Sequence, residues 1–256
     1  MHPFNSALIV LDSVDSTNNY AMAKVHAGLA KHGDGWFAQH QSTGKGQRGK
    51  SWHTGNGKNI ALSIVIEPMP LLITEQFKLS AAIALACFDF FSTYAGDETK
   101  IKWPNDIYWR DRKAGGILIE NVIGKSSGNN KKYSSSSWKY AIAGIGININ
   151  EADFDRGLTN AVSLKQITGK DFESVELAKQ LQQIVLKRVK ELHQKPFEVL
   201  LKEYNNNLYK MNRAVRLKKN NIEFESVIKG VTETGQLYTT DRIDNFFDFG
   251  EVEWIL

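Results

Sequence analysis

The chain has 256 residues, which is long enough to bury a substantial core as one large domain or as one domain with a small appendage. Its 42% hydrophobic and 23% charged residues are ordinary for a soluble globular protein, and its formal net charge of +4 suits anionic ligands but is too small to indicate nucleic-acid binding by itself. The single cysteine, Cys87, lies in a mostly apolar run, which excludes an intramolecular disulfide and fits a reducing cytoplasm.

The first residues of the chain show no basic patch followed by a long apolar stretch, so no secretory signal peptide is expected. The longest uninterrupted apolar runs are well short of the roughly 18 residues that a membrane helix needs. We therefore expect a soluble, cytoplasmic protein with no membrane association.

Strands and two helices are predicted in the first part of the chain. The polar run Asp15-Ser16-Thr17-Asn18 is typical of a helix N-cap, and Thr74, followed by Glu75 and Gln76, starts a second helix with an Ala-rich face. The expected elements are a strand at 7–11, a helix at 19–31, a strand at 36–40, a strand at 59–66 and a helix at 74–91.

Four more strands are predicted further along, at 100–103, 107–109, 116–123 and 138–147. Two helices follow, at 172–195 and 197–206. The longer helix carries apolar residues at three- and four-residue steps, and Pro196 ends or kinks it. Residues 124–137 contain a four-serine run and polar neighbours that cannot form a core, which predicts a surface hairpin loop.

The pattern changes near residue 210. From Arg213 to Leu256, short alternating segments are separated by glycines, which favours a small antiparallel barrel. We therefore expect a domain boundary that divides the chain into residues 1–208 and 209–256.

Residues 44–51 read Gly-Lys-Gly-Gln-Arg-Gly-Lys-Ser and match the phosphate-binding P-loop pattern G-x-x-x-x-G-K-[ST] letter by letter. A P-loop runs straight into a helix, whose N-terminal amides hold the phosphates. Here the following residues, 52–57, contain two glycines and an Asn-Gly pair, which are turn signals and disfavour a helix. The octet is therefore predicted to lie in a loop between two strands.

Such a loop can still bind an anion, because its glycines let backbone amides point inward while Lys45, Arg48, Lys50 and Lys58 supply positive charge. No Asp or Glu occurs from residue 35 to residue 66 to neutralise these charges. Taken alone, the cluster fits a mobile, solvated basic loop better than an anion site, and the anion-site interpretation depends on other segments.

A second informative cluster is Lys102-Trp103-Pro104-Asn105-Asp106, followed by Lys113 and the pair Gly115-Gly116. Pro104 blocks continuation of a strand ladder, so Asn105 and Asp106 are expected at a strand end where polar side chains can face a cleft. The glycine pair permits close approach of a ligand or of backbone. A simple tight turn is the alternative interpretation of this cluster.

The third cluster is Gly144-Ile145-Gly146-Ile147-Asn148, in which glycines alternate within an apolar strand. Glycine weakens a strand, so two at alternate positions indicate that something packs against that face. A dinucleotide-binding G-x-G-x-x-G motif is excluded, because Ile149 occupies its last glycine position and an Asn-rich turn replaces the helix. A bulge or a contact between sheet and helix remains the alternative.

The order and spacing of these segments resemble the biotin protein ligases across nearly the whole chain. The matching segments are Asp15 to Asn18, Gly44 to Trp52, Lys102 to Asp106, Lys113 with Gly115 and Gly116, and Gly144 to Asn148. The winged helix-turn-helix of the bifunctional ligase-repressors has no counterpart, so the resemblance is to the monofunctional form without a DNA-binding domain. It implies an α+β fold: a mixed β-sheet with flanking helices, of the class II synthetase-like and biotin–lipoate ligase-like kind, plus a small C-terminal SH3-like β-barrel.

The resemblance implies a biotin–[acetyl-CoA-carboxylase] ligase, an AMP-forming enzyme that makes an amide bond. Biotin and ATP, with Mg²⁺ held largely by the ATP phosphates, would give biotinyl-5′-AMP. A lysine of a biotin carboxyl carrier protein domain would then take the biotinyl group. No nucleic-acid or membrane partner is expected, the protein is expected to be a monomer or homodimer, and no protein ligand of the metal is identified.

The family motifs also imply site residues. The expected catalytic residues are Lys113, Arg48 and Asp106, with Lys102 as a neighbour that keeps Asp106 ionised. The expected biotin-binding residues are Ser16, Thr17, Asn18, Gln41, Lys45, Gly46, Gln47, Lys113 and Gly116. The expected ATP- or adenylate-binding residues are Lys45, Arg48, Lys50, Trp52, Asn105, Asp106 and Asn148.

One position departs from the family pattern. Many biotin protein ligases carry Arg where this chain has Gln47, and the chain keeps an Arg only at the next position, Arg48. Two consequences are possible in principle: Arg48 replaces the missing charge, or the acyl-adenylate is held less tightly and escapes more readily.

Two other functions compete with this interpretation. A lipoate or octanoate ligase or transferase of the related fold would also modify a carrier lysine, but the Trp-ended loop and the Lys-Trp-Pro-Asn-Asp segment favour biotin. A nucleic-acid-binding module built on the basic loop would need a recognisable recognition helix or aromatic pattern, and the chain has neither.

Overall fold

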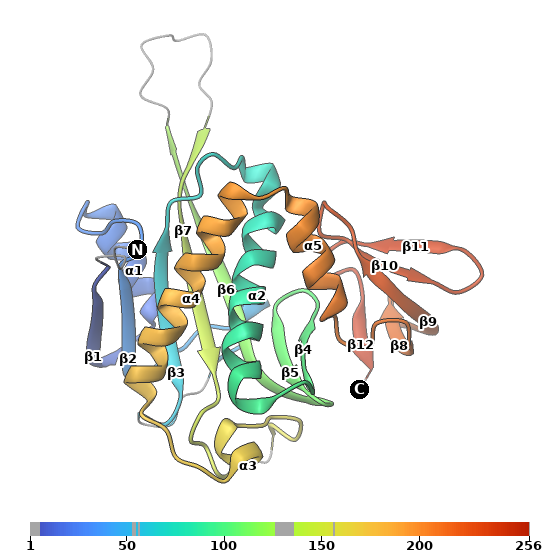
Figure 1. The fold of residues 1–256 in the computed structure, drawn as a ribbon, viewed down its shortest axis with the longest axis horizontal. Coiled ribbons are helices and arrows are strands. Elements are labelled where there is room, and N and C mark those ends of the chain that lie inside the picture. Colours follow the sequence, from blue (N-terminus) through green and yellow to red (C-terminus); the bar gives the residue numbers. More distant parts are fainter. Residues whose placement is uncertain (1–5, 53–54, 56, 126–135, 156, 256) are drawn as a thin grey trace.

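The protein is described by a computed structural model for residues 6–52, 55, 57–125, 136–155 and 157–255. A seven-stranded sheet has the order β1-β2-β3-β7-β6-β5-β4 (Figure 1). Only β1 and β2 pair in parallel, so the sheet is mixed. Its strands are β1 (Leu8–Val14), β2 (Gly35–Gln41), β3 (Ile60–Ile66), β4 (Thr99–Lys102), β5 (Asp106–Trp109), β6 (Arg112–Lys125) and β7 (Ser136–Ile147).

Helices cover both faces of this sheet. On one face, α2 (Gln76–Ala95) and α4 (Ser174–Gln194) lie side by side, followed by α5 (Phe197–Asn206) (Figure 1). On the other face, α1 (Thr17–His26) packs over β2, β3 and β7, where its Ala21 joins a small cluster with Trp36, Val65 and Ile142. Successive side chains of a strand point to opposite faces of the sheet, so alternate residues of these strands contribute to the core on each face.

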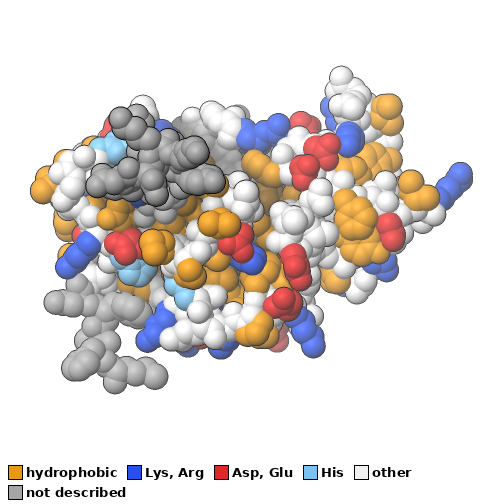
Figure 2. Space-filling view, turned by 90° about the horizontal axis from the view of Figure 1, so that it is seen from above, with side chains coloured by type: hydrophobic (Ala, Val, Ile, Leu, Met, Phe, Trp, Pro, Cys, Tyr) orange, Lys and Arg blue, Asp and Glu red, His pale blue; other side chains and the backbone are white. Residues whose placement is uncertain are grey.

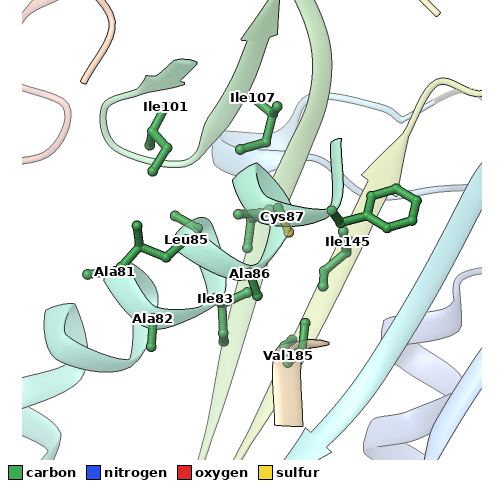
Figure 3. Packing of buried hydrophobic residues seen from close by; sticks show 14 of the residues in the cluster. Ala81, Ala82, Ile83, Leu85, Ala86, Cys87, Ile101, Ile107, Ile145 and Val185 are labelled. Carbon is green, nitrogen blue, oxygen red and sulfur yellow. The ribbon is translucent and has the colours of Figure 1, made fainter. Parts of the chain in front are cut away.

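Helix α2 is the centre of the main core. Its small and branched side chains face Ile101 and Ile107 from the edge strands, Ile145 from β7 and Val185 from α4 (Figure 3). The segment Ile73–Ala95 is long and apolar enough to cross a membrane by length and composition. Its position between a sheet and a second helix accounts for that composition, because a helix buried on both sides is apolar around most of its circumference.

Five C-terminal strands form a separate antiparallel sheet with the order β11-β10-β9-β8-β12, beside α5 (Figure 1). They are β8 (Ala214–Lys219), β9 (Ile222–Val231), β10 (Leu237–Thr240), β11 (Asp244–Phe247) and β12 (Glu253–Ile255). This arrangement agrees with the expected SH3-like unit in size and strand direction. Within the described part of the chain no pairing joins β11 to β12, so the strands form an open sheet instead of a closed barrel.

The predicted helices and strands are all present, with shifted ends. Helix α1 stops at His26, five residues earlier than predicted, and the Ser16 side chain makes no capping hydrogen bond. The short helix α3 (Leu164–Thr168) was not predicted from the sequence; it is capped by Ser163, whose side chain accepts a hydrogen bond from the Gln166 amide. Most of the predicted serine-rich hairpin loop lies outside the described residues.

Arg188 joins α2, α4 and α5 through ion pairs on the face of the sheet that these helices cover. From α4 its guanidinium binds Asp89 on α2 through two bonds of 2.6 and 2.9 Å and Glu203 on α5 through two bonds of 2.9 and 2.5 Å. The Arg188 side chain is 12% exposed. Glu191, on the same helix, also pairs with it at 3.2 Å, so removing Arg188 leaves three carboxylates close together without this cation.

We expect Arg188→Met to lower the free energy of unfolding by about 2–3 kcal/mol. This is less than the cost of breaking a fully buried ion pair, because the carboxylates that pair with Arg188 are partly exposed. Urea denaturation followed by circular dichroism measures the change. Lys187→Met, at the exposed neighbouring position on α4, is the matched control and should change the value by less than about 0.5 kcal/mol. Equal losses in the two variants would remove this role from Arg188.

Candidate active site

A trough on the α1 side of the main sheet is formed by small residues in register across its strands. Gly146 on β7 pairs with Ala61 on β3 and with Gly116 on β6, and Gly116 pairs in turn with Asp106 on β5. Directly opposed residues point to the same face of a sheet. The row therefore carries almost no side chain at Gly146 and Gly116, and the Asp106 carboxylate lies at its end.

The glycines in this trough are required by close contacts. A Cβ atom added to Gly144 would lie 2.3 Å from Asn18 Oδ1, and one added to Gly146 would lie 2.2 Å from Trp52 Cε2. Contacts this short are not tolerated, so any side chain at either position would displace its neighbour. The alternating glycines were predicted to accommodate something packed on that strand face, and Asn18 and Trp52 are what packs there.

Neutral polar groups line one end of the trough, at the start of α1. The Ser63 hydroxyl lies 2.8 Å from Thr17 Oγ1 and 2.6 Å from Asn18 Oδ1, while Gln41 Oε1 accepts a 2.8 Å hydrogen bond from the Thr17 amide. Ser16, Thr17 and Asn18 are all almost fully buried. This end can exchange hydrogen bonds with an uncharged polar ligand, because it offers donors and acceptors without net charge.

The glycine- and lysine-rich segment forms a small hairpin between β2 and β3. The Trp52 amide donates to the Gly44 carbonyl at 2.8 Å and the Gly46 amide to the Lys50 carbonyl at 2.6 Å, with a single 3₁₀ turn, Gln47–Gly49, at the tip. Ser51, Trp52, Gly55 and Gly57 are not helical. The prediction of an irregular loop in place of a P-loop is therefore confirmed for the described residues.

At the tip of the hairpin, Gln47 and Arg48 point to different parts of the molecule. The Gln47 side-chain amide donates to the Ile117 carbonyl at 3.2 Å, and its own oxygen is buried without a partner in the described part of the chain. Arg48 adopts a left-handed backbone conformation with φ 55°. Its guanidinium lies 3.5 Å from the Gly250 carbonyl and 5.9 Å from the ring centroid of Phe249, against the C-terminal segment.

Lys113 reaches the trough because β6 carries a bulge. The register with β5 shifts between Ile107 and Tyr108, so that Lys113 pairs with Tyr108 while Gly115 pairs with Ile107. A bulge of this kind turns a side chain to the other face. Lys113 Nζ then lies 2.7 Å from Asp106 Oδ1, directly above Gly116. This geometry places an ammonium and a carboxylate side by side in the wall of the cavity.

Positive charge gathers at the β4–β6 end of the trough. Lys102 on β4 is 9% exposed and pairs in register with Asp106. Burial lowers the pKa of Lys102 to about 8; Asp106 opposes this shift, and the neighbouring charges of Lys113 and Lys50 add to it. Asp106 forms its ion pair with Lys113, and no ion pair joins it to Lys102 in the described part of the chain.

The structure brings every predicted site residue to the wall of one cavity of about 980 Å³. Asn105 and Asn148 also form hydrogen bonds to the backbone. The Asn105 side chain donates to the Ile117 carbonyl at 2.7 Å, and the Asn148 side chain donates to the Val162 carbonyl at 3.1 Å. The predicted residues on this wall are Ser16, Thr17, Asn18, Gln41, Lys45, Gly46, Gln47, Arg48, Lys50, Trp52, Asn105, Asp106, Lys113, Gly116 and Asn148.

Several residues of the site had no signal in the sequence. Ser63 completes the neutral end, and Glu120 binds both Lys45 at 3.3 Å and Asn18 at 2.7 Å. Phe249 and Trp254 from the C-terminal segment also line the cavity. Lys58 likewise pairs with Glu151 at 3.0 Å. Carboxylates distant in sequence thus partly neutralise the loop lysines.

Residues 10–130, which carry both ends of the trough, match the biotin/lipoate A/B protein ligase family. This match spans slightly less than half of the chain. One relative of the family domain is the bifunctional ligase/repressor BirA of Escherichia coli, which is 35% identical over 122 residues, 47% of this chain and 36% of the relative. Another is the biotin–[acetyl-CoA-carboxylase] ligase of Paracoccus denitrificans, which is 34% identical over 167 residues, 62% of this chain and 63% of the relative.

The fold extends beyond the family domain. The biotin protein ligase from Aquifex aeolicus, solved in complex with biotin and ATP, matches with a TM-score of 0.79 and 22% identity over 98% of this chain and 99% of that chain. Both the mixed sheet and the C-terminal sheet are therefore shared. The chain spans about a third of the Escherichia coli relative and less than two thirds of the Paracoccus one, so its chemistry has to be argued from its own residues.

Proposed function

We propose that this protein is an ATP-dependent biotin protein ligase. A carboxylate oxygen of biotin attacks the α-phosphorus of ATP, the bond from that phosphorus to the bridging oxygen breaks, and pyrophosphate leaves. The resulting biotinyl-5′-AMP is then attacked by a lysine amine of a biotin carboxyl carrier protein domain. An amide bond forms, the amine loses a proton, and AMP leaves.

The continuity of the cavity is the observation that carries this proposal. A neutral, buried hydrogen-bonding end at Thr17 and Asn18 and a cationic end at Lys113 and Lys102 share one trough floored by glycine. Biotin has the same polarity, with an uncharged ureido ring at one end and a carboxylate at the other. The matched relatives that bear biotin in their names support this assignment over lipoate.

The residues take the following roles in the proposal. Ser16, Thr17, Asn18 and Gln41 hold the ureido ring, and Lys113 holds the biotin carboxylate and then the acyl phosphate. The Trp52 ring lies beside the adenine, and its indole nitrogen is buried against Gly146 without a partner in the described part of the chain. Asp106 accepts a proton from, or orients, the attacking amine in the second step.

Magnesium fits this site as a companion of ATP. No group of three or more His, Cys, Asp and Glu residues that could hold a metal occurs within the described residues. Mg²⁺ keeps several waters and commonly binds through substrate phosphates with few protein ligands. When bound it would neutralise phosphate charge, while Lys113 supplies fixed positive charge from the protein.

We also propose the boundary at 208/209 as a functional division. Residues 1–208 supply both ends of the trough, and residues 209–256 contribute the wall made by Phe249, Val252 and Trp254. Trp103 of the first part donates to the Gly235 carbonyl of the second at 2.9 Å, which fixes their contact beside the site.

Incubation of the protein with biotin, ATP and Mg²⁺, followed by mass analysis for biotinyl-5′-AMP, tests the proposal directly. Reactions without biotin, and with lipoate or octanoate in its place, are the controls. ATP consumption that does not depend on biotin, or acyl-adenylate formed more rapidly from lipoate, would refute the assignment. Transfer to a carrier domain and to its Lys→Arg variant tests the second step.

One face of the molecule, seen from above (Figure 2), lacks the charge pattern that the nucleic-acid alternative requires. On the face shown in Figure 2, the Lys and Arg side chains of the described residues are scattered among acidic and hydrophobic ones. Nucleic-acid binding needs a continuous basic patch or stripe. A binding constant that fell steeply with salt would restore that alternative.

We expect Gln47→Arg to slow the release of free biotinyl-5′-AMP about tenfold, because a charge-assisted hydrogen bond to the acyl phosphate contributes about 1.5 kcal/mol or more. The contact of Arg48 with Gly250 and Phe249 favours looser retention over replacement of the missing charge. A chase experiment with excess unlabelled biotin measures the release rate. Gln47→Met, of similar size but without charge, should show no slowing, and an unchanged rate in the Arg variant would discard the idea.

A further inference from the structure

Lys102 continues the register row that floors the trough. Gly146 pairs with Gly116, Gly116 with Asp106, and Asp106 with Lys102 at the edge strand β4. Its side chain therefore rises on the same face as Asp106 and lines the same cavity. The neutral end near Asn18 lies at the other side of the row, beyond β7.

The surroundings of the Lys102 ammonium are unusual for a buried charge. It lies 5.1 Å from the ring centroids of both Tyr108 on β5 and Trp254 on β12, so that the C-terminal sheet supplies half of an aromatic cage. It makes no hydrogen bond or ion pair of its own within the described part of the chain. Aromatic faces stabilise a cation but leave its N–H donors unused.

The other lysines of the site differ in this respect. Lys45, Lys58 and Lys113 each pair with a carboxylate, at 3.3, 3.0 and 2.7 Å. A buried cation without an anionic partner costs folding free energy, and such a group is retained where a ligand supplies the missing charge. A ligand for Lys102 has to be anionic and has to reach past the Lys113–Asp106 pair.

We infer that Lys102 binds the β- and γ-phosphates of ATP and the pyrophosphate that leaves, an inference that rests on the proposed ligase function. When the α-phosphorus forms its new bond to the biotin carboxylate, the breaking bond leaves its electron pair, and a full negative charge, on pyrophosphate. Lys113 is then engaged with the acyl phosphate. Lys102 is the remaining buried ammonium in the row, and it stabilises the departing group.

The role separates polyphosphate from adenylate. Biotinyl-5′-AMP has lost the two terminal phosphates, so a residue that contacts only those phosphates affects ATP and pyrophosphate and leaves adenylate binding unchanged. A residue that merely supports the cavity affects all three ligands.

The test uses Lys102→Met in the full-length chain, with three measurements: the KM for ATP in biotin-dependent ATP–pyrophosphate exchange, inhibition by pyrophosphate, and the affinity for a non-hydrolysable biotinyl-adenylate analogue. We expect the KM for ATP and the pyrophosphate inhibition constant to rise about tenfold to a hundredfold. Affinity for the analogue should stay within about twofold, which also reports that the variant is folded. Lys102→Arg, which keeps the charge, should recover most of the ATP affinity.

The matched control is Lys100→Met, since Lys100 lies two residues earlier on β4 and does not line the cavity. An unchanged KM for ATP in Lys102→Met would overturn the inference. Equal weakening of ATP and analogue would also overturn it, as would an Arg variant no better than Met, or a defect confined to transfer from preformed adenylate. Failure of the wild-type protein to show biotin-dependent exchange would instead refute the ligase function itself.

Discussion

Lys113→Ala will reduce the rate of biotinyl-5′-AMP formation about 10²- to 10³-fold while the protein stays folded. The ammonium of Lys113 is positioned by a β-bulge over Gly116, 2.7 Å from Asp106, in the cationic end of the cavity. Loss of one positioned donor that stabilises developing charge has effects of this size. Pyrophosphate release in the presence of biotin and ATP measures the rate.

Folding should be nearly unaffected by the same change, because the Lys113 side chain is 33% exposed and its ion pair contributes at most about 1 kcal/mol. Lys165→Ala is a matched control, since Lys165 also pairs with an aspartate at 2.7 Å, at a side-chain exposure of 36%, but outside the cavity. That variant should retain wild-type activity. Normal pyrophosphate release by Lys113→Ala would remove Lys113 from the mechanism.

Gly144→Ala and Gly146→Ala will separate the two halves of the site, although the positions are only two residues apart. The methyl group of the first meets Asn18 Oδ1 at 2.3 Å and should weaken biotin binding. The methyl group of the second meets the Trp52 ring at 2.2 Å and should weaken ATP binding while biotin still binds. Overpacking costs about 1–3 kcal/mol, which corresponds to about fivefold to a hundredfold in affinity.

Isothermal titration with biotin, and the KM for ATP at saturating biotin, distinguish the two effects. Gly157→Ala is a suitable control, because no atom lies within 4 Å of the position of its added Cβ. We expect Gly144→Ala to lower mainly the affinity for biotin and Gly146→Ala to lower mainly the affinity for ATP. If both lost biotin and ATP affinity in equal proportion, the division of the trough between Asn18 and Trp52 would be wrong.

Local signals in the sequence were sufficient for most of the fold. The Asn-Gly pair and glycines after Ser51 excluded a helix there, and the apolar periods predicted β3, α2 and α4. The motif residues converge because the register between β3, β7, β6 and β5 brings four separate segments into one row. Each motif marks a strand end or a small residue, and these features can be recognised in a linear sequence.

Other features depend on contacts that no local pattern encodes. The bulge that turns Lys113 into the cavity arises from the pairing of β5 with β6, and Glu120 meets Lys45 only because two remote segments pack together. The cage around Lys102 needs Trp254 from a separate sheet. The short helix α3 has too few residues for a hydrophobic period to be detected.

The position of Cys87 leaves the hairpin between β2 and β3 open to site-specific labelling. This cysteine is the single one in the sequence, it is fully buried in α2, and burial raises the pKa of its thiol well above the usual range. A maleimide dye will therefore leave it unmodified in the folded protein. A thiol introduced at Ser51, an exposed position near the end of the hairpin, would be the sole labelled group, and its fluorescence would report whether the surroundings of the hairpin change when biotin and ATP are added.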